Sequence, residues 1–245
     1  DKNVRRALIK SMDRETYGNV LLKGTYIPGG PMLPPSLDYA FDELDKMNPD
    51  KYDVEAAKKL LADAGWKDTD GDGFVDKDGK NLELNFTFYS GRAELPLFAE
   101  AVQSDAKKVG IKVNLKNVDY NILFDIGKKG EYDLLISNIL TEQAGDPEFF
   151  MNVYFRTNKD GNTPENASGY SNPEYDALSE KLSGEFDPAK RRDIIIQMEK
   201  IMMNDAGTVI LGYPKTNLVS SKNIANANIY PCDYYWVTKD ITPAK

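Results

Sequence analysis

Two strand patterns on either side of one helix pattern constrain the fold of this chain most. Apolar and polar residues alternate over residues 82–88 and again over residues 111–115, as expected of strands with one buried face. Between them, residues 97–109 place apolar side chains at helical spacing, and Gly110 ends that helix. A strand, a helix and a strand so close in sequence form a βαβ unit, whose two strands are expected to be parallel. The predicted fold class is α/β.

Further strands and helices are predicted downstream. Residues 132–139 are nearly all apolar, so we expect a third strand in the centre of the sheet. A strand is also predicted over residues 208–213, and the Asn-rich residues 215–245 are expected to be irregular. Three helices have explicit start signals, because a capping Asp or Asn precedes a proline at the first helical position. These pairs are Asp146-Pro147, Asn172-Pro173 and Asp187-Pro188.

The N-terminal part is expected to contain two helices and an extended connection. The first helix is predicted from about Asn3 to Leu22, and Gly24 stops it. Prolines and glycines between residues 28 and 35 exclude a helix there. Asp53 is placed to cap the second helix, over residues 54–64.

Composition excludes several classes of function. The formal net charge of −8 argues against a nucleic-acid or anionic-membrane surface, because both require clustered lysine and arginine. The chain has no histidine, which removes Ser-His-Asp and Cys-His catalysis and histidine-containing zinc sites. The single cysteine, Cys232, is expected to be a small, partly buried residue. No carboxylate pair stands out from the helix caps and exposed acids, so we expect no enzyme.

The start of the chain carries no targeting signal. It opens at Asp1 directly before a helical pattern, which suggests a processed or excised piece. No apolar run approaches the roughly 20 residues that span a bilayer. We therefore expect no direct membrane insertion of this piece.

An aspartate-rich loop before the first predicted strand is a candidate calcium site. Asp68, Asp70, Asp72 and Asp76 match positions 1, 3, 5 and 9 of an EF-hand loop. Position 12 should be a bidentate glutamate and is Gly79, which weakens the pattern. The alternative is a polar turn, because Asp and Gly are frequent turn residues. Two interpretations stay open, a calcium-binding interaction module and a turn that joins a helix to a strand.

Read together, these segments resemble the family 5 extracellular solute-binding proteins, which serve oligopeptide, dipeptide and nickel uptake by ABC transporters. Any one stretch is a weak signal, but five agree in order and spacing from end to end of the chain. They are NVRRALIKSMDRE with LLKGTYIP, YDVEAAKKLLADAGW with its GDG loop, KKVGIKVNLKNVDY, GEYDLL leading to Asp146-Pro147, and YSNPEYDALSEKL with DPAKRRDIIIQMEKIMMNDA.

The resemblance implies a lobe like those of type II periplasmic binding proteins, with a mixed, mostly parallel sheet flanked by helices. Residues 1–213 resemble the second, ligand-binding lobe. Residues 214–245 resemble the segment that returns to a first lobe, which this chain lacks. The family implies a membrane-tethered lipoprotein, extracellular or periplasmic, that encloses an oligopeptide or similar small solute between two lobes and delivers it to permease subunits. It implies no cofactor.

The resemblance also places a ligand-facing surface near residues 138–146. A residue before the Asp-Pro helix often supplies a carboxylate to a peptide's α-amino group, and the spacing here points to either Glu142 or Gln143. Glu142 could form an ion pair with an amine, whereas Gln143 offers only neutral hydrogen bonds. Asp146 is assigned to helix capping and to support of the loop. The ligand-binding residues predicted on this basis are Asn138, Thr141, Glu142, Gln143 and Asp146.

Two departures from the family pattern leave the ligand open. The common Gly-Trp at the end of the third strand is Asn138-Ile139 here, which removes an aromatic wall. Nickel-type members use a histidine after the Asp-Pro helix, and this chain has none. Peptides, metal chelates, sugars and other small solutes are all compatible with the sequence. The piece alone is expected to bind ligand weakly or not at all, because half of the enclosure is missing.

Overall fold

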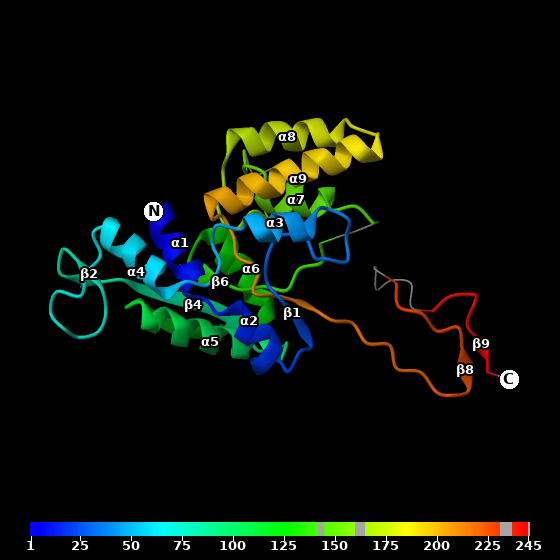
Figure 1. Cartoon of the computed structure of the whole chain (residues 1–245), viewed down its shortest axis with the longest axis horizontal. Coiled ribbons are helices and arrows are strands. Elements are labelled where there is room, and N and C mark those ends of the chain that lie inside the picture. Colours follow the sequence, from blue (N-terminus) through cyan, green and yellow to red (C-terminus); the bar gives the residue numbers. More distant parts are fainter. Residues whose placement is uncertain (142–144, 160–164, 231–236, 245) are drawn as a thin grey trace.

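The structure, a computed structural model, describes residues 1–141, 145–159, 165–230 and 237–244. Figure 1 shows a sheet with helices on its faces, a second body made of helices, and a terminal segment that extends away from both. The apolar core is divided in the same way, because the buried side chains form two separate clusters. The mixed α/β architecture with a parallel sheet confirms the predicted fold class.

The parallel sheet has the strand order β5-β4-β6. Strand β4 (Glu83–Tyr89) pairs in parallel with β5 (Lys112–Val118) and with β6 (Leu134–Leu135). Helix α5 (Glu94–Lys108) connects β4 to β5, and helix α6 (Tyr120–Lys129) connects β5 to β6. The predicted βαβ unit and its parallel pairing are therefore confirmed.

The third strand is not central, contrary to the prediction. The centre is β4, whose residues 86–89 are all buried. Strand β6 is short and, among the described strands, pairs only with β4. Just past the end of β6, the Ile136 amide donates a hydrogen bond to the Thr87 carbonyl of β4. The apolar residues after β6 instead join the two cores, since Ile136 is buried in the first cluster and Ile139 packs against the second. The apolar character of the run therefore does not indicate a central place in the sheet.

The predicted N-terminal helix is divided in three. Helix α1 (Lys2–Ser11) ends before the extended residue Met12, and α2 (Arg14–Thr16) and the π-helical turn η1 (Tyr17–Leu21) follow. The break occurs at Asp13, whose carboxylate accepts a hydrogen bond from the Thr16 amide at 3.1 Å. The Asp13 amide donates to the buried Asp105 carboxylate at 2.9 Å. A partner far along the chain thus restarts the helix, which the local pattern could not indicate.

Other elements of the first body follow the predicted signals. Helix α4 (Val54–Asp63) begins at Asp53, whose carboxylate accepts from the Ala56 amide at 2.9 Å. The aspartate loop leads to the hairpin of β2 (Asp76–Lys77) and β3 (Lys80–Asn81). Strand β1 (Tyr26–Pro28) pairs antiparallel with β7 (Gly212–Pro214), which is shorter than the predicted strand. A Cβ on the neighbouring Gly29 would lie 1.7 Å from the Ile210 carbonyl oxygen, so only glycine fits there.

The second body contains helices α7 (Glu148–Phe155), α8 (Pro173–Ser183) and α9 (Pro188–Asp205), with α3 (Phe41–Met47) beside them (Figure 1). Asn172 and Asp187 cap α8 and α9 before their prolines, as predicted. The buried face of α9 supplies much of the second core, through Ile194, Ile195, Met198 and Met202.

The chain leaves both bodies after β7. It forms a small hairpin of β8 (Ile224–Ala225) and β9 (Thr242–Pro243), and the rest of residues 215–230 and 237–244 is irregular, as predicted. Within the described ranges, no helix is both long enough and apolar enough to cross a membrane.

Candidate functional site

The three parallel strands end at one edge of the sheet. In open α/β sheets, ligands bind in the crevice outside the carboxyl ends of the strands. Residues 90–92 follow β4, Asp119 and Tyr120 follow β5, and residues 136–138 follow β6. This carboxyl edge is therefore the candidate binding surface of the described part of the chain.

Aromatic side chains cover part of the carboxyl edge. The Tyr120 ring lies edge-on to Tyr89, with centroids 5.0 Å apart, and edge-on to Phe124 at 5.5 Å. Tyr89 is buried, but Tyr120 is 49% exposed. An exposed ring fixed by two others offers a rigid apolar surface for a ligand to contact.

Polar and charged residues also follow the ends of these strands. The Asn117 amide donates to the Ser90 hydroxyl at 3.3 Å, which links the ends of β5 and β4. Arg92 is exposed and forms no ion pair with the residues that the structure describes. The sequence interpretation did not single out Arg92 or Tyr120. The signal that would have found them is their position directly after two predicted parallel strands.

The predicted ligand-facing segment runs from the first core to the second. Asn138 is half-buried and lies between Ile136 in one cluster and Ile139 against the other. Thr141 is also half-buried. Asn138 thus lies at the carboxyl edge, directly after β6. Glu142 and Gln143 lie outside the described residues, so the choice between them stays a prediction.

Asp146 has two partners. One carboxylate oxygen accepts a hydrogen bond from the Glu148 amide at 2.8 Å, as expected of a residue that caps α7. The other accepts from the Arg191 guanidinium at 3.0 and 3.2 Å. The cap position is taken by Pro147, so α7 begins at Glu148, one residue later than predicted. Asp146 thus stands one residue before the cap, and the protein holds it on both oxygens.

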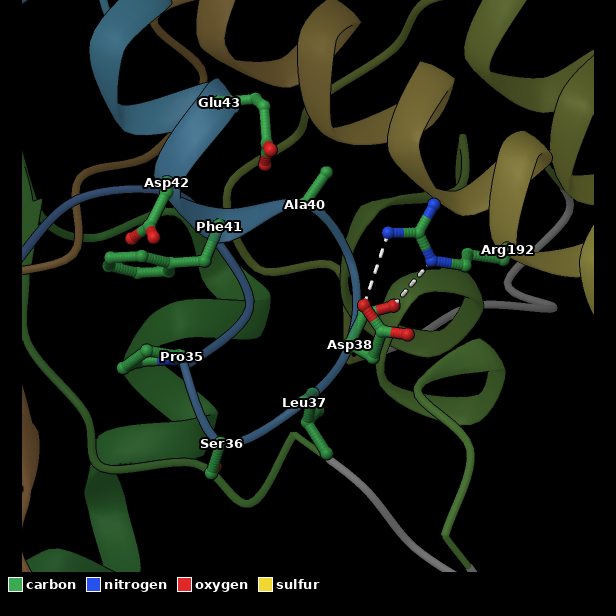
Figure 2. A pocket seen from close by; sticks show the side chains of 9 residues that line it. All are labelled: Pro35, Ser36, Leu37, Asp38, Ala40, Phe41, Asp42, Glu43 and Arg192. Carbon is green, nitrogen blue, oxygen red and sulfur yellow. Dashed lines mark hydrogen bonds and ion pairs between the residues drawn. The ribbon is translucent and has the colours of Figure 1, made fainter.

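An open cavity of about 370 Å³ lies at the start of α3. It is lined by residues 35–38 and 40 of the loop before α3, by residues 41–43 at the start of α3, and by Arg192, which Figure 2 shows bonded to Asp38. Arg192 donates to the Asp38 carbonyl at 2.8 Å and to its carboxylate at 3.1 Å. Of the predicted ligand residues, the three that the structure describes, Asn138, Thr141 and Asp146, do not line it.

Buried hydrogen bonds hold the loop before α3 against the rest of the protein. The Leu33 amide donates to the Glu199 carboxyl at 2.8 Å, and the Tyr213 hydroxyl donates to the Pro31 carbonyl. Glu199 is fully buried, and burial raises the pKa of its carboxyl to about 8. The group is therefore neutral below that pH and serves as an anchor for the loop.

The aspartate loop closes largely on itself. Oxygens of Asp68, Asp70 and Asp76 lie within 4.8 Å of one another, whereas Asp72 is not part of this group. Both Asp68 oxygens accept backbone amides of the loop, and the buried Asp76 accepts from the Thr69 amide and hydroxyl. The Phe74 amide and the Asn81 side chain bond Asp72 and lower the pKa of its carboxyl. Three of the four predicted calcium ligands are thus brought together, and calcium binding stays a prediction.

Comparison with known proteins identifies a family. Residues 1–162 match "Bacterial extracellular solute-binding proteins, family 5 Middle". The chain is 28% identical over 250 residues to the oligopeptide-binding protein AppA of Bacillus subtilis (strain 168), covering 98% of this chain and 44% of AppA. It is 27% identical over 237 residues to the nickel-binding protein NikA of Staphylococcus aureus, covering 96% and 44%. The chain thus spans about half the length of the curated relatives it matches.

Solved structures agree with this comparison. The structure of AppA from Bacillus subtilis in complex with a nonapeptide superposes with a TM-score of 0.77 at 25% identity, covering 100% of this chain and 48% of AppA. The oligopeptide-binding protein of Thermotoga maritima with bound mannohexaose gives 0.76 at 26% identity, covering 87% and 41%. The fold is that of the type II periplasmic binding proteins. Since the family match extends over most of the chain and includes all three parallel strands, this protein belongs to the bacterial extracellular solute-binding proteins of family 5.

Proposed function

We propose that this chain is the second, ligand-binding lobe of the substrate-binding component of an ABC importer. The observation that carries the proposal is the carboxyl edge of the sheet, where Arg92, Tyr120 and Asn138 each follow the end of a parallel strand and none is buried. A ligand held only there would keep one side in water. A second lobe closing over it would supply the missing side, and the chain spans about half of its relatives' length.

In this proposal, residues 1–213 form the ligand-binding lobe. Residues 214–245 form a segment that packs on the first lobe, which this chain lacks. Apolar side chains of this segment point into solvent, with Val219 91% exposed and Val237 90% exposed. Exposed apolar side chains in a segment that leaves the body are typical of a contact surface without its partner.

The proposed ligand is a peptide or a similar small solute. It would be captured outside the cytoplasmic membrane and delivered to the permease subunits of the transporter. The names of the relatives support this range, since AppA was solved with a nonapeptide and the Thermotoga maritima protein with mannohexaose. Arg92 would attract a carboxylate or another anionic group, and either Glu142 would pair with an amine or Gln143 would form neutral hydrogen bonds with it. Tethering as a lipoprotein is part of the same proposal.

Ligand co-purification tests the proposal. The complete two-lobe protein should retain a small solute that native mass spectrometry detects and denaturation releases. Calorimetry with a nonapeptide, mannohexaose and nickel chelated by histidine then separates the ligand classes. The isolated 245-residue chain should bind the same probes far more weakly. Sub-micromolar binding by the isolated chain would contradict the two-lobe proposal.

A further inference from the structure

Two large aromatic side chains are exposed at one end of the second body. Phe186, in the turn between α8 and α9, is 86% exposed, and Phe149, in the first turn of α7, is 49% exposed. Isolated apolar side chains are common on protein surfaces, whereas grouped aromatic side chains are typical of contact sites. The contacts around these two residues show that they belong to one surface.

The backbone that carries Phe186 is firmly held. The Glu185 carboxylate accepts hydrogen bonds from the Phe186 and Asp187 amides, both at 3.0 Å. Arg191 donates to the Glu185 carbonyl at 2.8 Å, and Asp187 accepts from the Ala189 amide at 3.0 Å as the cap of α9. The turn therefore presents an exposed ring on a fixed backbone, which reduces the entropy that is lost when a partner binds it.

Arg191 also brings Phe149 to the same end of the body. Its guanidinium donates to one oxygen of the Glu148 carboxylate at 2.8 Å, and the other oxygen accepts from the Ser183 hydroxyl, at the end of α8, at 2.7 Å. Phe149 follows Glu148 directly, so the start of α7 lies beside the end of α8. Phe149 and Phe186 therefore flank one junction of three helices.

A hollow adjoins this junction. Arg192, the residue after Arg191 on α9, lines the open cavity of about 370 Å³ together with Leu37 and Phe41 (Figure 2). We call Phe149, Phe186 and this cavity the end surface. Exposed aromatic anchors next to a concave region are the features with which one protein binds another.

The end surface lies on the side of the molecule that the proposed first lobe would occupy. In Figure 1 the β2–β3 hairpin, from which the chain enters β4, is at the left, so the carboxyl edge of the parallel sheet is on the right. The turn between α8 and α9 is at the right-hand end of the second body, and the terminal segment extends to the right as well. More than half of AppA lies outside the match with this chain, since the match covers 44% of AppA.

We propose that the end surface is a docking site for the first lobe of the complete protein, which contacts Phe149 and Phe186 when the lobes close over a ligand. The inference rests on the proposed function, because it requires a first lobe that closes. It adds a contact between the lobes that does not involve the ligand. Such a contact favours the closed form and so raises the affinity for every ligand that the closed form holds.

Hydroxyl-radical footprinting of the complete two-lobe protein tests the contact. The probes are a nonapeptide, mannohexaose and nickel chelated by histidine, and mass spectrometry of peptides measures the oxidation of each side chain. Phe149 and Phe186 should be oxidised several-fold more slowly with a bound probe than without one. Met47 is the internal control, because it is 63% exposed at the end of α3 opposite the cavity and should keep its reactivity.

A substitution measures how much the contact contributes. In the complete protein, Phe186→Ser should weaken the binding of the same probe about tenfold, because truncation of an interface anchor typically has an effect of this size. Met47→Ser should bind like wild type. In the isolated 245-residue chain, Phe186→Ser should leave the melting temperature within about 1 °C of wild type, because the ring is exposed there. This comparison separates docking from folding.

Several outcomes would overturn the inference and leave the proposed function intact. One is equal oxidation of both rings with and without a bound probe, and another is wild-type affinity in Phe186→Ser. Protection that grows with protein concentration in the absence of a probe would assign the surface to a second copy of the protein. Loss of transport with unchanged affinity would assign it to the permease. A wild-type protein that retains no solute and binds none of the probes would refute the proposed function, and the inference with it.

Discussion

Glu199 illustrates how one buried residue makes stability depend on pH. Its carboxyl is fully buried, accepts the Leu33 amide on one oxygen, and has no partner among the described residues on the other. Burial raises the pKa of the carboxyl from 4.5 to about 8. Between these values the folded protein keeps a proton that the unfolded chain releases. The free energy of unfolding therefore falls as pH rises, by roughly 1.4 kcal/mol per pH unit from this group.

Glu199→Gln should remove this dependence. A glutamine keeps the acceptor for the Leu33 amide and does not ionise, so the unfolding free energy of the variant should vary less between about pH 5 and pH 8. Urea unfolding at two pH values in this window measures the difference. Glu100→Gln, at an exposed position on α5, is the control and should keep the wild-type slope. Equal slopes in wild type and Glu199→Gln would show that the buried carboxyl is already ionised.

Individual residues were predictable from sequence where their partners are local. Asp53, Asn172 and Asp187 cap helices that begin within three residues of them, and each was predicted correctly. The bond from Arg191 to Asp146 joins residues 45 positions apart, and no spacing rule connects them. Long-range polar pairs depend on tertiary packing, so they emerge only once the fold is known.

At the scale of elements, the aspartate loop allows a direct test. Its carboxylates already accept the loop's own amides, and Gly79 stands where a calcium loop needs a bidentate glutamate. We therefore expect about 1 mM calcium to shift the melting temperature by less than about 1 °C relative to chelator. Asp70→Asn, which keeps an acceptor for the Asp72 amide, should melt like wild type in both conditions. A calcium-dependent shift of several degrees that Asp70→Asn abolishes would establish a calcium site.

Some sequence patterns predicted the pairing and order of the strands correctly, and one did not. Alternation over residues 82–88 and 111–115 predicted two parallel strands, and β4 and β5 confirm them. The apolar run of residues 132–139 predicted a central strand wrongly, because β6 lies at the edge of the sheet and the residues after it join two cores, with only Ile136 of the run buried. Periodicity describes how many faces of a segment are covered. It does not identify what covers them.

At the scale of the whole molecule, polar contacts join the two bodies. The Arg5 guanidinium donates to the carbonyls of Ala206 and Asp205, at 3.0 and 2.8 Å, and Arg6 donates to that of Asn204 at 2.8 Å. Basic residues of α1 thus satisfy the carbonyl end of α9, where cations are favoured. The two apolar clusters are separate, but these bonds and the segment after β6 link them. The sequence predicted the lobe as a unit and gave no sign of its internal division.

The terminal segment provides the last prediction. Between the described residues, no hydrogen bond or ion pair joins residues 216–244 to residues 1–214, and Val219 and Val237 are almost fully exposed. Removing residues 216–245 from this chain should therefore change its melting temperature by no more than about 2 °C, because the described residues of this segment bury little surface.

The same deletion in the complete two-lobe protein should have a different result. If the segment packs on the first lobe, its loss removes apolar contacts and should lower the melting temperature by several degrees and weaken ligand retention. Differential scanning calorimetry of the four proteins, long and short chains with and without the first lobe, gives the comparison. A large loss of stability in the short isolated chain would show that the segment belongs to this lobe. An unchanged two-lobe protein would show that it contacts neither lobe.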